Sequence, residues 1–439
     1  MAKAPFTNIH IHVFNTECAP DNFLRIITSN FVRKHPKTFK SIIDKRFTRG
    51  IIRRLAKWGA DKKGKDRGSV NKYISFLEVG TTNRQLDIYR DALAVAQKYD
   101  PQCRLIGLSL NMDHMDDKGR PPKNFNTQLK ELKQIKKYYP DQFFPFVCVD
   151  PRAHAGQLMV NWMKKFFENG MRSPETGMVR PYFAGIKMYP ALGFFPFDPR
   201  LDEMYAYAER EGIPIMSHCT RVGSQYIGPS IESLIPREVD MIHPEDSTSP
   251  EFIKAKSEIH ARIERYYSQN PSWIKNNDYG DNDLACDLFG HPQNYIPVML
   301  KYPKLKICLA HMGGDDQIEL MNPEKETDNE IIKLDGYNWA SLVKELMLTF
   351  PNLYTDISYT LAKLDEKKVR DEIQDWLRSA DQEGKALNQR ILFGTDFYMT
   401  EREARESELY QKAQNQLSQW MTVMSRDNCE RYLFELPEA

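Results

Sequence analysis

The sequence predicts an α/β fold, a (β/α)8 TIM barrel distorted by large insertions after its first and fifth strands. Three observations lead to this prediction. Eight short apolar runs recur along the chain, amphipathic segments of helix length lie between most of them, and the 439 residues leave room for insertions beyond the roughly 250 of a plain barrel. Two or three ordinary domains would also fit this length, and a doubly wound open sheet is the main rival architecture.

The eight predicted strands follow one another along the whole chain. They cover Asn8–Val13, Arg104–Leu110, Phe143–Val149, Ala184–Met188, Pro214–His218, Lys306–Ala310, Leu353–Ile357 and Arg390–Phe393. The predicted helices between them include Thr82–Lys98, Asn126–Tyr138, Ala155–Asn169, Leu201–Glu211, Tyr337–Thr349 and Glu366–Ala380. Strands that alternate with helices pair in parallel, and eight is the number that closes a barrel. We therefore expect residues 1–439 to form a single barrel.

Two stretches interrupt this alternation. Residues 21–80 are predicted to be a basic helical insertion, because positions 33–72 hold fifteen Lys/Arg and only three Asp. Such a run binds an acidic partner or an anionic substrate or, more commonly, is a solvated helical surface. Residues 221–299 contain a polar helix, Pro250–Tyr267, and a loop rich in Asn and Asp. Insertions after barrel strands fall on the face that carries active sites, so we expect 221–299 to be a lid over the barrel mouth.

The composition argues against several functional classes. The formal net charge is +1, so no global field favours nucleic acid or membrane. The seven cysteines are scattered and contain no CxxC pair, which argues against a disulfide framework and favours a reducing cytoplasm. The sequence has neither a signal-peptide core nor an apolar run of about 18 residues. We expect a cytoplasmic protein with a small-molecule substrate and no nucleic-acid or membrane partner; a homodimer is compatible with these features.

The first strand carries the sequence Ile9-His10-Ile11-His12-Val13. Side chains alternate between the two faces of a strand, so His10 and His12 point the same way. Two imidazoles on one face can bind one divalent metal. A pair of core histidines would produce the same pattern, so His-x-His by itself is weak evidence.

Other strand ends strengthen the case for a metal. Strand five ends at His218, strand six ends at His311 before Met-Gly-Gly, and strand eight runs into Gly-Thr-Asp396. The carboxyl ends of barrel strands converge on one mouth, where neutral imidazoles and a carboxylate suit zinc and related transition metals. Three strands that each end in a ligand-type residue, together with His-x-His, are hard to explain by core packing alone.

Lys187 lies inside the apolar run of strand four, where an unpaired charge is costly. Three explanations stay open for it: a carbamylated ligand that bridges two metals, an anchor for a substrate carboxylate, and one half of a buried ion pair.

In this order, His-x-His, His218, His311 and Gly-Thr-Asp396 resemble the amidohydrolase superfamily. The sequence segments around these residues resemble the amidohydrolase-related branch that includes aminocarboxymuconate semialdehyde decarboxylase. The segments that carry this resemblance are AGIKMYP, GIPIMSHC, HPQNYIPVMLKYPKLKICLAHMGG, FPNLYTDIS, RILFGTDF and DNCERYLF. It covers Asn8–Phe14 and most of Ala184–Phe434, and it fades over residues 21–80 and much of Arg221–Asp287.

The resemblance implies metal binding by His10, His12, His218 and Asp396. It also implies that His311 is an acid/base beside the metal-activated water, and that Asp396 serves as a base as well as a ligand. We expect one divalent transition metal, zinc first, with Mn²⁺ or Fe²⁺ as alternatives. Many members of this branch lack a lysine at the position of Lys187, whereas binuclear hydrolases use one there. A binuclear site with carbamylated Lys187 is therefore the less favoured alternative.

Other residues of the mouth are candidates for substrate binding. Lys187 and Arg221 could hold a substrate carboxylate, although Arg221 is equally well explained as a surface arginine. Tyr189 and Phe195 follow strand four, and they either wall a flat pocket or pack under a lid.

The chemistry of such a site favours hydrolysis of a small amide, ester or lactone, because a zinc-type ion lowers the pKa of bound water to about 7. His311 or Asp396 would move the proton between water and leaving group. Non-oxidative decarboxylation of a small carboxylic acid, a lyase reaction, is the alternative. A non-catalytic binding barrel is a remote one, and a nucleic-acid role for positions 33–72 finds little support because aromatic residues are sparse there.

Overall fold

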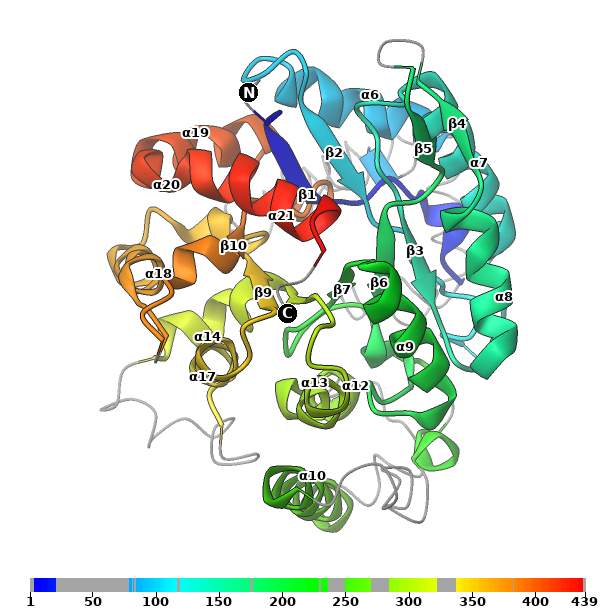
Figure 1. Ribbon diagram of the computed structural model, residues 1–439, viewed down its shortest axis with the longest axis vertical. Coiled ribbons are helices and arrows are strands. Elements are labelled where there is room, and N and C mark those ends of the chain that lie inside the picture. The colour runs from blue at the N-terminus through cyan, green and yellow to red at the C-terminus, as the bar shows by residue number, and fades with distance from the viewer. Residues whose placement is uncertain are drawn as a thin grey trace, which may run out of the picture.

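The computed structural model describes residues 4–20, 79–80, 82, 84–116, 119–173, 177–228, 230–235, 249–269, 284–321, 337–381 and 383–436. Within these ranges, parallel strands surround a central axis and helices cover them on the outside (Figure 1). The predicted basic helical insertion at 21–80 lies almost entirely outside the described residues and stays a prediction.

All eight predicted strands are present, and they are short. Their bounds are β1 (Thr7–Ile11), β2 (Arg104–Gly107), β3 (Phe146–Val149), β6 (Gly185–Met188), β7 (Ile215–Ser217), β8 (Ile307–Leu309), β9 (Leu353–Asp356) and β10 (Ile391–Leu392). Most end earlier than predicted, because the chain leaves the hydrogen-bonded ladder at its carboxyl end to build the mouth of the barrel. A small antiparallel pair, β4 (Gly170–Arg172) and β5 (Val179–Pro181), lies beside them.

The strands close into a ring. β1 pairs with β2, and a parallel series runs β3-β6-β7-β8-β9-β10. Parallel bridges from Leu105 to Phe143 and from Leu108 to Phe146 join β2 to the β3 segment. On the other side, the Ile9 amide donates to the Phe393 carbonyl at 2.9 Å, which joins β1 to the end of β10. The predicted eight-stranded parallel barrel is therefore confirmed, and the open-sheet alternative is wrong.

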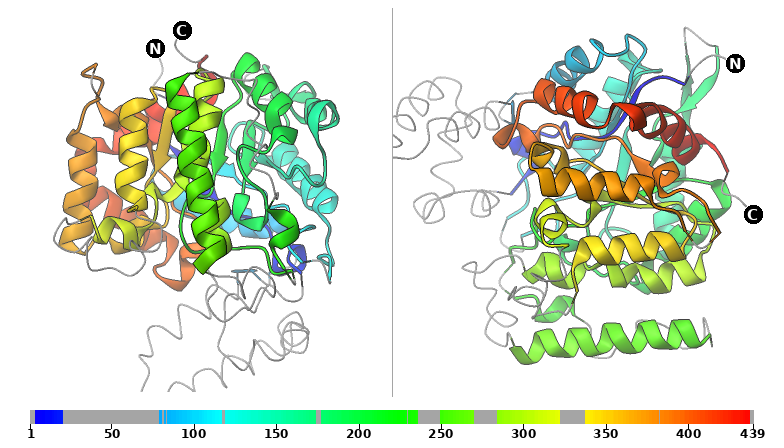
Figure 2. Two further views of the ribbon diagram at one scale, coloured as in Figure 1. Left: turned by 90° about the horizontal axis from the view of Figure 1, so that it is seen from below. Right: turned by 90° about the vertical axis from the view of Figure 1, so that its left-hand side faces the viewer.

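Helices cover the outside of this ring (Figures 1 and 2). The main ones are α6 (Gln85–Ala96), α7 (Phe125–Tyr138), α8 (Gly156–Phe167), α9 (Asp202–Glu211), α12 (Leu284–Phe289), α13 (Ile296–Lys301), α14 (Asp315–Glu319), α17 (Trp339–Thr349), α18 (Lys367–Arg378), α19 (Glu406–Gln416), α20 (Ser418–Thr422) and α21 (Asn428–Phe434). Local signals set several ends. The Asn124 side chain accepts from the Thr127 amide to begin α7, and Asn338 does the same for α17 through Ser341. No helix of the described part is long and apolar enough to cross a bilayer.

Two hydrophobic clusters stabilise the barrel. Alternate strand residues, among them Met216, Cys308, Tyr354 and Leu392, form an inner cluster with Tyr432 of α21. Their strand neighbours belong to a larger outer cluster shared with the surrounding helices (Ile215, Ile307, Leu353 and Ile391). Strands buried on both faces read as continuous apolar runs, which is why the sequence pattern located them well.

The second insertion is described in part. Helix α10 (Pro250–Gln269) lies outside the ring beside α13, and its residues Phe252, Ile259 and Ile263 belong to the outer cluster (Figures 1 and 2). Residues 236–248 and 270–283 are outside the described ranges. A lid formed by 221–299 therefore stays a prediction.

Candidate metal centre

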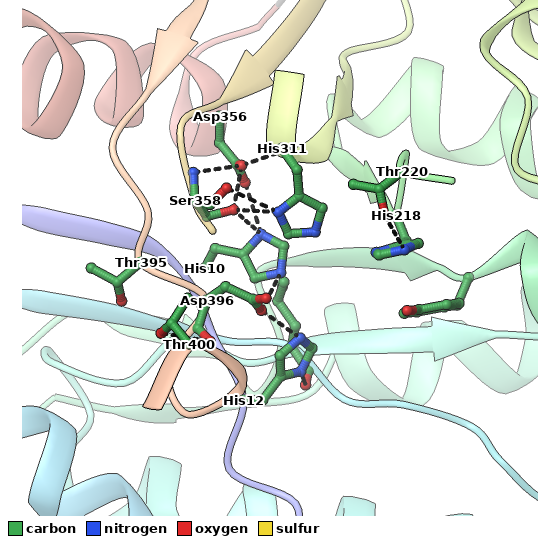
Figure 3. A network of polar contacts seen from close by, with 12 residues as sticks. His10, His12, His218, Thr220, His311, Asp356, Ser358, Thr395, Asp396 and Thr400 are labelled. Carbon is green, nitrogen blue, oxygen red and sulfur yellow. Dashed lines mark hydrogen bonds and ion pairs between the residues drawn. The ribbon is translucent and has the colours of Figure 1, made fainter. Parts of the chain in front are cut away.

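Polar side chains gather where the strands end at the mouth of the barrel (Figure 3). They come from five different strands or the residues that follow them: His10 and His12 from β1, His218 after β7, His311 after β8, Asp356 at the end of β9, and Asp396 after β10. The barrel brings them together from positions more than 380 residues apart. A cavity of about 280 Å³ opens onto His12, His218, His311 and Asp396.

The two histidines of β1 are oriented by hydrogen bonds at Nδ1. His10 Nδ1 lies 2.8 Å from Asp356 Oδ2, and His12 Nδ1 lies 3.1 Å from the Leu108 carbonyl oxygen. Both partners accept hydrogen bonds, so each Nδ1 carries the hydrogen. Burial lowers the pKa of His10 well below its usual value, and the nearby charge of Lys187 acts in the same direction. A neutral His10 therefore presents a bare lone pair on Nε2.

That lone pair faces the carboxylate of Asp396. His10 Nε2 lies 3.3 Å from Asp396 Oδ1, and His12 Nε2 lies 3.2 Å from the same oxygen. His10 Nε2 and Asp396 Oδ1 are both buried, and neither has a hydrogen-bond partner among the described residues. Two facing lone pairs repel each other, which is costly in a buried site. A cation between them would remove this cost.

The donor set fits a divalent metal. The ligand atoms of His10, His12 and Asp396 all lie within 4.8 Å of one another. Two neutral imidazoles with one carboxylate are a set typical of zinc and related transition ions. Gly394 allows the strands to approach closely here, because a Cβ at this position would lie 2.8 Å from the Cβ of His10. The geometry of these three residues could therefore hold a metal ion.

Asp356 is a residue of the candidate site that the sequence analysis did not single out. Besides His10, it accepts hydrogen bonds through Oδ1 from the backbone amides of His311 (2.9 Å) and Ser358 (3.1 Å), and from the Ser358 hydroxyl. It is fully buried. His10, His311 and Asp356 also lie close enough to bind a metal, but the oxygens of Asp356 are already engaged. Its role is to orient His10 and His311. An aspartate at the end of an apolar strand, the signal that identified Asp396, could have found it.

His311 lies beside His10 and Asp356, and one of its ring nitrogens is hydrogen-bonded. Its Nδ1 is 3.2 Å from the Ser358 carbonyl oxygen and 2.9 Å from the Ser358 hydroxyl. Burial lowers its pKa well below the usual value, so the ring is neutral. The backbone φ of His311 is +68°, and that of Asp396 is +61°. Non-glycine residues in this region are uncommon and concentrate at functional sites, where the surrounding structure holds them.

His218 lines the same cavity but is bonded to its own loop. Its Nε2 lies 2.9 Å from the Thr220 hydroxyl and 3.0 Å from the Val222 carbonyl oxygen. Its ring stacks on Tyr189 at 4.2 Å between centroids. Burial lowers the pKa of His218 to about 3, and Lys187 adds to this effect. It does not belong to the group whose ligand atoms already face one another.

A family model described as Amidohydrolase matches residues 132–430, about two thirds of the chain. That stretch includes β3 and β6–β10 and ends within α21. The chain belongs to the amidohydrolase family. It is accordingly an enzyme, and the arrangement of its buried histidines and aspartates agrees with a metal-dependent one. No curated protein matches this amidohydrolase.

Several solved structures resemble this amidohydrolase at low sequence identity. One is 5-carboxyvanillate decarboxylase from Novosphingobium aromaticivorans, complexed with manganese (13% identity, 98% of this chain and 96% of that chain, TM-score 0.45). Another is 2,6-dihydroxybenzoate decarboxylase from Rhizobium (14%, 98% of both chains, TM-score 0.45). A third is a probable 2-pyrone-4,6-dicarboxylic acid hydrolase from Acinetobacter baumannii with citric acid bound (8%, 78% and 88%, TM-score 0.40). Since these scores lie below 0.5, the assignment depends on the family match and the chain's own geometry.

The predicted substrate residues occupy different places in this amidohydrolase. Tyr189 lines the cavity, and its hydroxyl accepts from the Ser224 amide at 3.0 Å. Phe195 is buried against Phe197 and does not line the cavity. Arg221 is also outside the cavity lining, because its guanidinium donates to both carboxylate oxygens of Asp287, at 2.9 and 3.0 Å.

Lys187 is fully buried on the inner side of β6, and no residue that the structure describes forms a hydrogen bond with its Nζ. Burial lowers its pKa, while the carboxylates of Asp356 and Asp396 act in the opposite direction. Lys187 thus lies within the electrostatic reach of both acids of the centre, although it makes no close ion pair with either. Lys187 is also absent from the cavity lining, so neither a close ion pair nor direct contact with a substrate has a matching contact among the described residues, and the role of Lys187 stays a prediction.

Proposed function

We propose that this amidohydrolase is a metal-dependent decarboxylase that acts on a small carboxylic acid. The metal dependence rests on one observation: His10 Nε2 and Asp396 Oδ1 are buried, face each other at 3.3 Å and find no hydrogen-bond partner within the described part of the chain. The decarboxylation is supported by the cavity walls and by the sequence resemblance described above. Apolar and aromatic side chains make up much of these walls (Phe14, Leu110, Tyr189, Val222, Tyr359 and Met399). Such surroundings solvate a reacting carboxylate poorly, which favours the loss of carbon dioxide.

The proposed ligands are His10, His12 and Asp396, with zinc as the first choice and Mn²⁺ or Fe²⁺ as alternatives. A metal held there would act as a Lewis acid on a substrate oxygen and would lower the pKa of water. We keep His218 as a fourth ligand in the proposal. Since its Nε2 is engaged by Val222 and Thr220, coordination requires its Nδ1 or the loss of these contacts. A carbamylated Lys187 that bridges two metals is the less favoured alternative.

The proposed acid/base is His311. Its Nδ1 is engaged by Ser358, so Nε2 is the nitrogen that can exchange a proton in the cavity. In decarboxylation the bond between the carboxyl carbon and the substrate carbon breaks, and the electron pair stays on the substrate carbon. Because the buried His311 ring is neutral, its Nε2 would first take a proton from a water molecule and then donate that proton to the substrate carbon as carbon dioxide leaves, with hydroxide as the other product. Asp396, at the same cavity wall, is the second candidate for proton transfer.

Metal-dependent hydrolysis of a small amide, ester or lactone is the second candidate. The observation that favours it is the polar part of the same cavity wall, which Thr220, Ser224 and Asp315 line together with the histidines. A water molecule there could give its proton to the neutral His311.

Product analysis separates the two reactions. The purified protein would be screened against small aromatic and unsaturated carboxylic acids and against matching amides, esters and lactones. Decarboxylation releases carbon dioxide without consuming water, whereas hydrolysis in ¹⁸O-labelled water places the label in the product. Metal analysis should find about one divalent transition metal per chain. Full activity after rigorous chelation, in protein shown to be metal-free, would overturn the metal-dependent proposal.

A further inference from the structure

An arginine shares the cavity with the candidate metal centre. Arg402 ends the short 3-10 helix Met399–Arg402, which begins three residues after Asp396. It lines the cavity, as does Tyr359, which follows β9. Among the described residues that line this cavity, Arg402 is the only lysine or arginine.

Among the residues that the structure describes, the guanidinium of Arg402 has no close carboxylate partner. Its Nε and Nη2 both donate to the Tyr359 hydroxyl oxygen, at 3.1 and 2.7 Å. Its ion pair with Glu403 is loose, with an Nε–Oε1 distance of 3.7 Å, and that carboxylate is half exposed. Other arginines of the chain differ: Arg221 and Arg152 each donate twice to one carboxylate, at distances of 2.7 to 3.0 Å. The positive charge of Arg402 is therefore less neutralised by carboxylates than the charges of Arg221 and Arg152.

The Tyr359 hydroxyl adds a second donor. Its oxygen accepts both arginine hydrogen bonds, and no described residue accepts its own hydrogen. The backbone φ of Tyr359 is +61°, in the left-handed region that bulky residues rarely adopt. Such strain is kept where the surrounding structure and function require a particular placement. Here the strained residue places a phenol against the guanidinium at the cavity wall.

We propose that Arg402 and Tyr359 form an anion subsite that binds a carboxylate of the substrate. A guanidinium with a neighbouring hydroxyl matches the oxygens of a carboxylate. Because ion pairing stabilises a carboxylate, the group held here is the one that the reaction retains, not the one lost at the metal centre. With Phe14 and Tyr189 also lining the cavity, the substrate class is a small flat acid that carries a second acidic group. This inference rests on the proposed function and deepens it.

The test compares two probes of equal shape and different charge. Benzoate and benzamide would be titrated into the protein as purified, with its metal, by calorimetry. In Arg402→Gln, benzoate affinity should fall by about 10- to 100-fold, while benzamide affinity changes less than about 3-fold. Tyr359→Phe should weaken benzoate by a smaller factor. Arg210→Gln, a change at a largely exposed arginine of α9, is the matched control and should have no effect.

Two results would overturn the subsite: unchanged benzoate affinity in folded Arg402→Gln, or equal losses for both probes. If Arg402→Gln does not fold, Arg402→Lys replaces it and should keep the preference for benzoate over benzamide at reduced affinity; loss of that preference would also count against the subsite. Metal content is measured in every variant. If the variants bind benzoate like the wild-type protein and contain the normal amount of metal, the subsite is wrong but the proposed function is untouched. If the wild-type protein contains no metal or stays active without it, the proposed metal dependence itself is wrong.

Discussion

At the scale of single residues, Asp356 decides which nitrogen of His10 faces Asp396. It accepts the Nδ1 hydrogen of His10 at 2.8 Å and, through its other oxygen, the amide hydrogen of His311 at 2.9 Å. One buried carboxylate thereby orients a proposed ligand and the proposed acid/base. Such partners hold a ligand ring in its binding orientation and raise its basicity.

We expect Asp356→Asn to lower metal affinity by about 10- to 100-fold, because the amide cannot accept from His10 with the strength of a carboxylate. Competition with a chromophoric chelator would measure this change. Asp365→Asn is the control, since that carboxylate is 63% exposed and pairs with Lys412. Equal metal affinity in Asp356→Asn and the wild-type protein would show that Asp356 does not tune the site.

His12→Ala should remove both the bound metal and the activity while leaving the secondary structure unchanged. The reason is that His12 supplies a proposed ligand atom at the cavity wall, whereas the apolar clusters hold the barrel. Metal analysis and circular dichroism would check the two parts of this prediction. His260→Ala, at an exposed position of α10, should keep the metal. A fully metallated and active His12→Ala protein would remove His12 from the site.

At the scale of elements, an ion pair anchors the loop after β7 that walls the cavity. Arg221 of this loop donates twice to Asp287 of α12, and its guanidinium lies 5.6 Å from the Trp339 ring centroid. Both side chains of the pair are less than one tenth exposed. The loop that carries Thr220 and Val222 is thereby connected to a helix on the outside of the barrel.

Arg221→Met should therefore destabilise the protein by about 3–5 kcal/mol, because it leaves a buried carboxylate without its closest cation. The double variant Arg221→Met/Asp287→Leu should recover part of the loss, since no charge is then stranded. Urea unfolding monitored by fluorescence would give both values. If the single variant proved as stable as the wild-type protein, the pair would contribute little to holding the loop.

At the scale of the whole molecule, the centre and a buried polar group connect the two ends of the chain. β1 and the segment after β10 meet at His10 and Asp396, whose facing lone pairs are unfavourable without a cation. On the same junction, buried Glu406 of α19 accepts from the Thr395 hydroxyl at 2.8 Å. The stability of this junction should therefore depend on the protonation of Glu406 and, in the proposed function, on a metal bound by His10 and Asp396.

Metal removal should lower the melting temperature, because a ligand that binds only the folded state stabilises it by about 2.7 kcal/mol at one hundred times its dissociation constant. Differential scanning calorimetry with and without a chelator would measure the shift. Asp396→Asn should show a much smaller response to the chelator. A chelator response of the same size in that variant would mean that the stabilising metal binds elsewhere.

The pH dependence of stability should carry a contribution from Glu406. Burial raises its pKa to about 8, against 4.5 for an ordinary glutamate, although the Thr395 hydrogen bond lowers it in part. Between these values the folded state holds a proton that the unfolded state has released. Stability therefore falls as pH rises from about 4.5 to about 8, by at most about 1.4 kcal/mol per pH unit for this group.

Glu406→Gln should remove this contribution, because glutamine imitates the protonated acid. Chemical denaturation at pH 5 and pH 8 should show the variant gaining stability relative to the wild-type protein at the higher pH. Glu383→Gln, at a side chain that is 75% exposed, is the control. A difference between Glu406→Gln and wild type that does not change with pH would contradict the raised pKa.

The sequence by itself predicted the positions of the strands, the barrel class and the proposed metal ligands. Strands buried on both faces are visible as apolar runs, and His218, His311 and Asp396 stand out because each ends such a run. The α/β prediction and the family resemblance are confirmed, while the ligand roles of these residues stay predictions.

Only the tertiary structure decided which of these side chains face one another and which are already engaged. It directs Arg221 to Asp287, ties His218 to its own loop, and brings Asp356 to His10 across 346 positions of sequence. It also places Arg402 against Tyr359 at the cavity wall. The physical reason is that hydrogen-bond pairing and left-handed backbone turns depend on how distant strands meet. No local pattern of residue types contains that information.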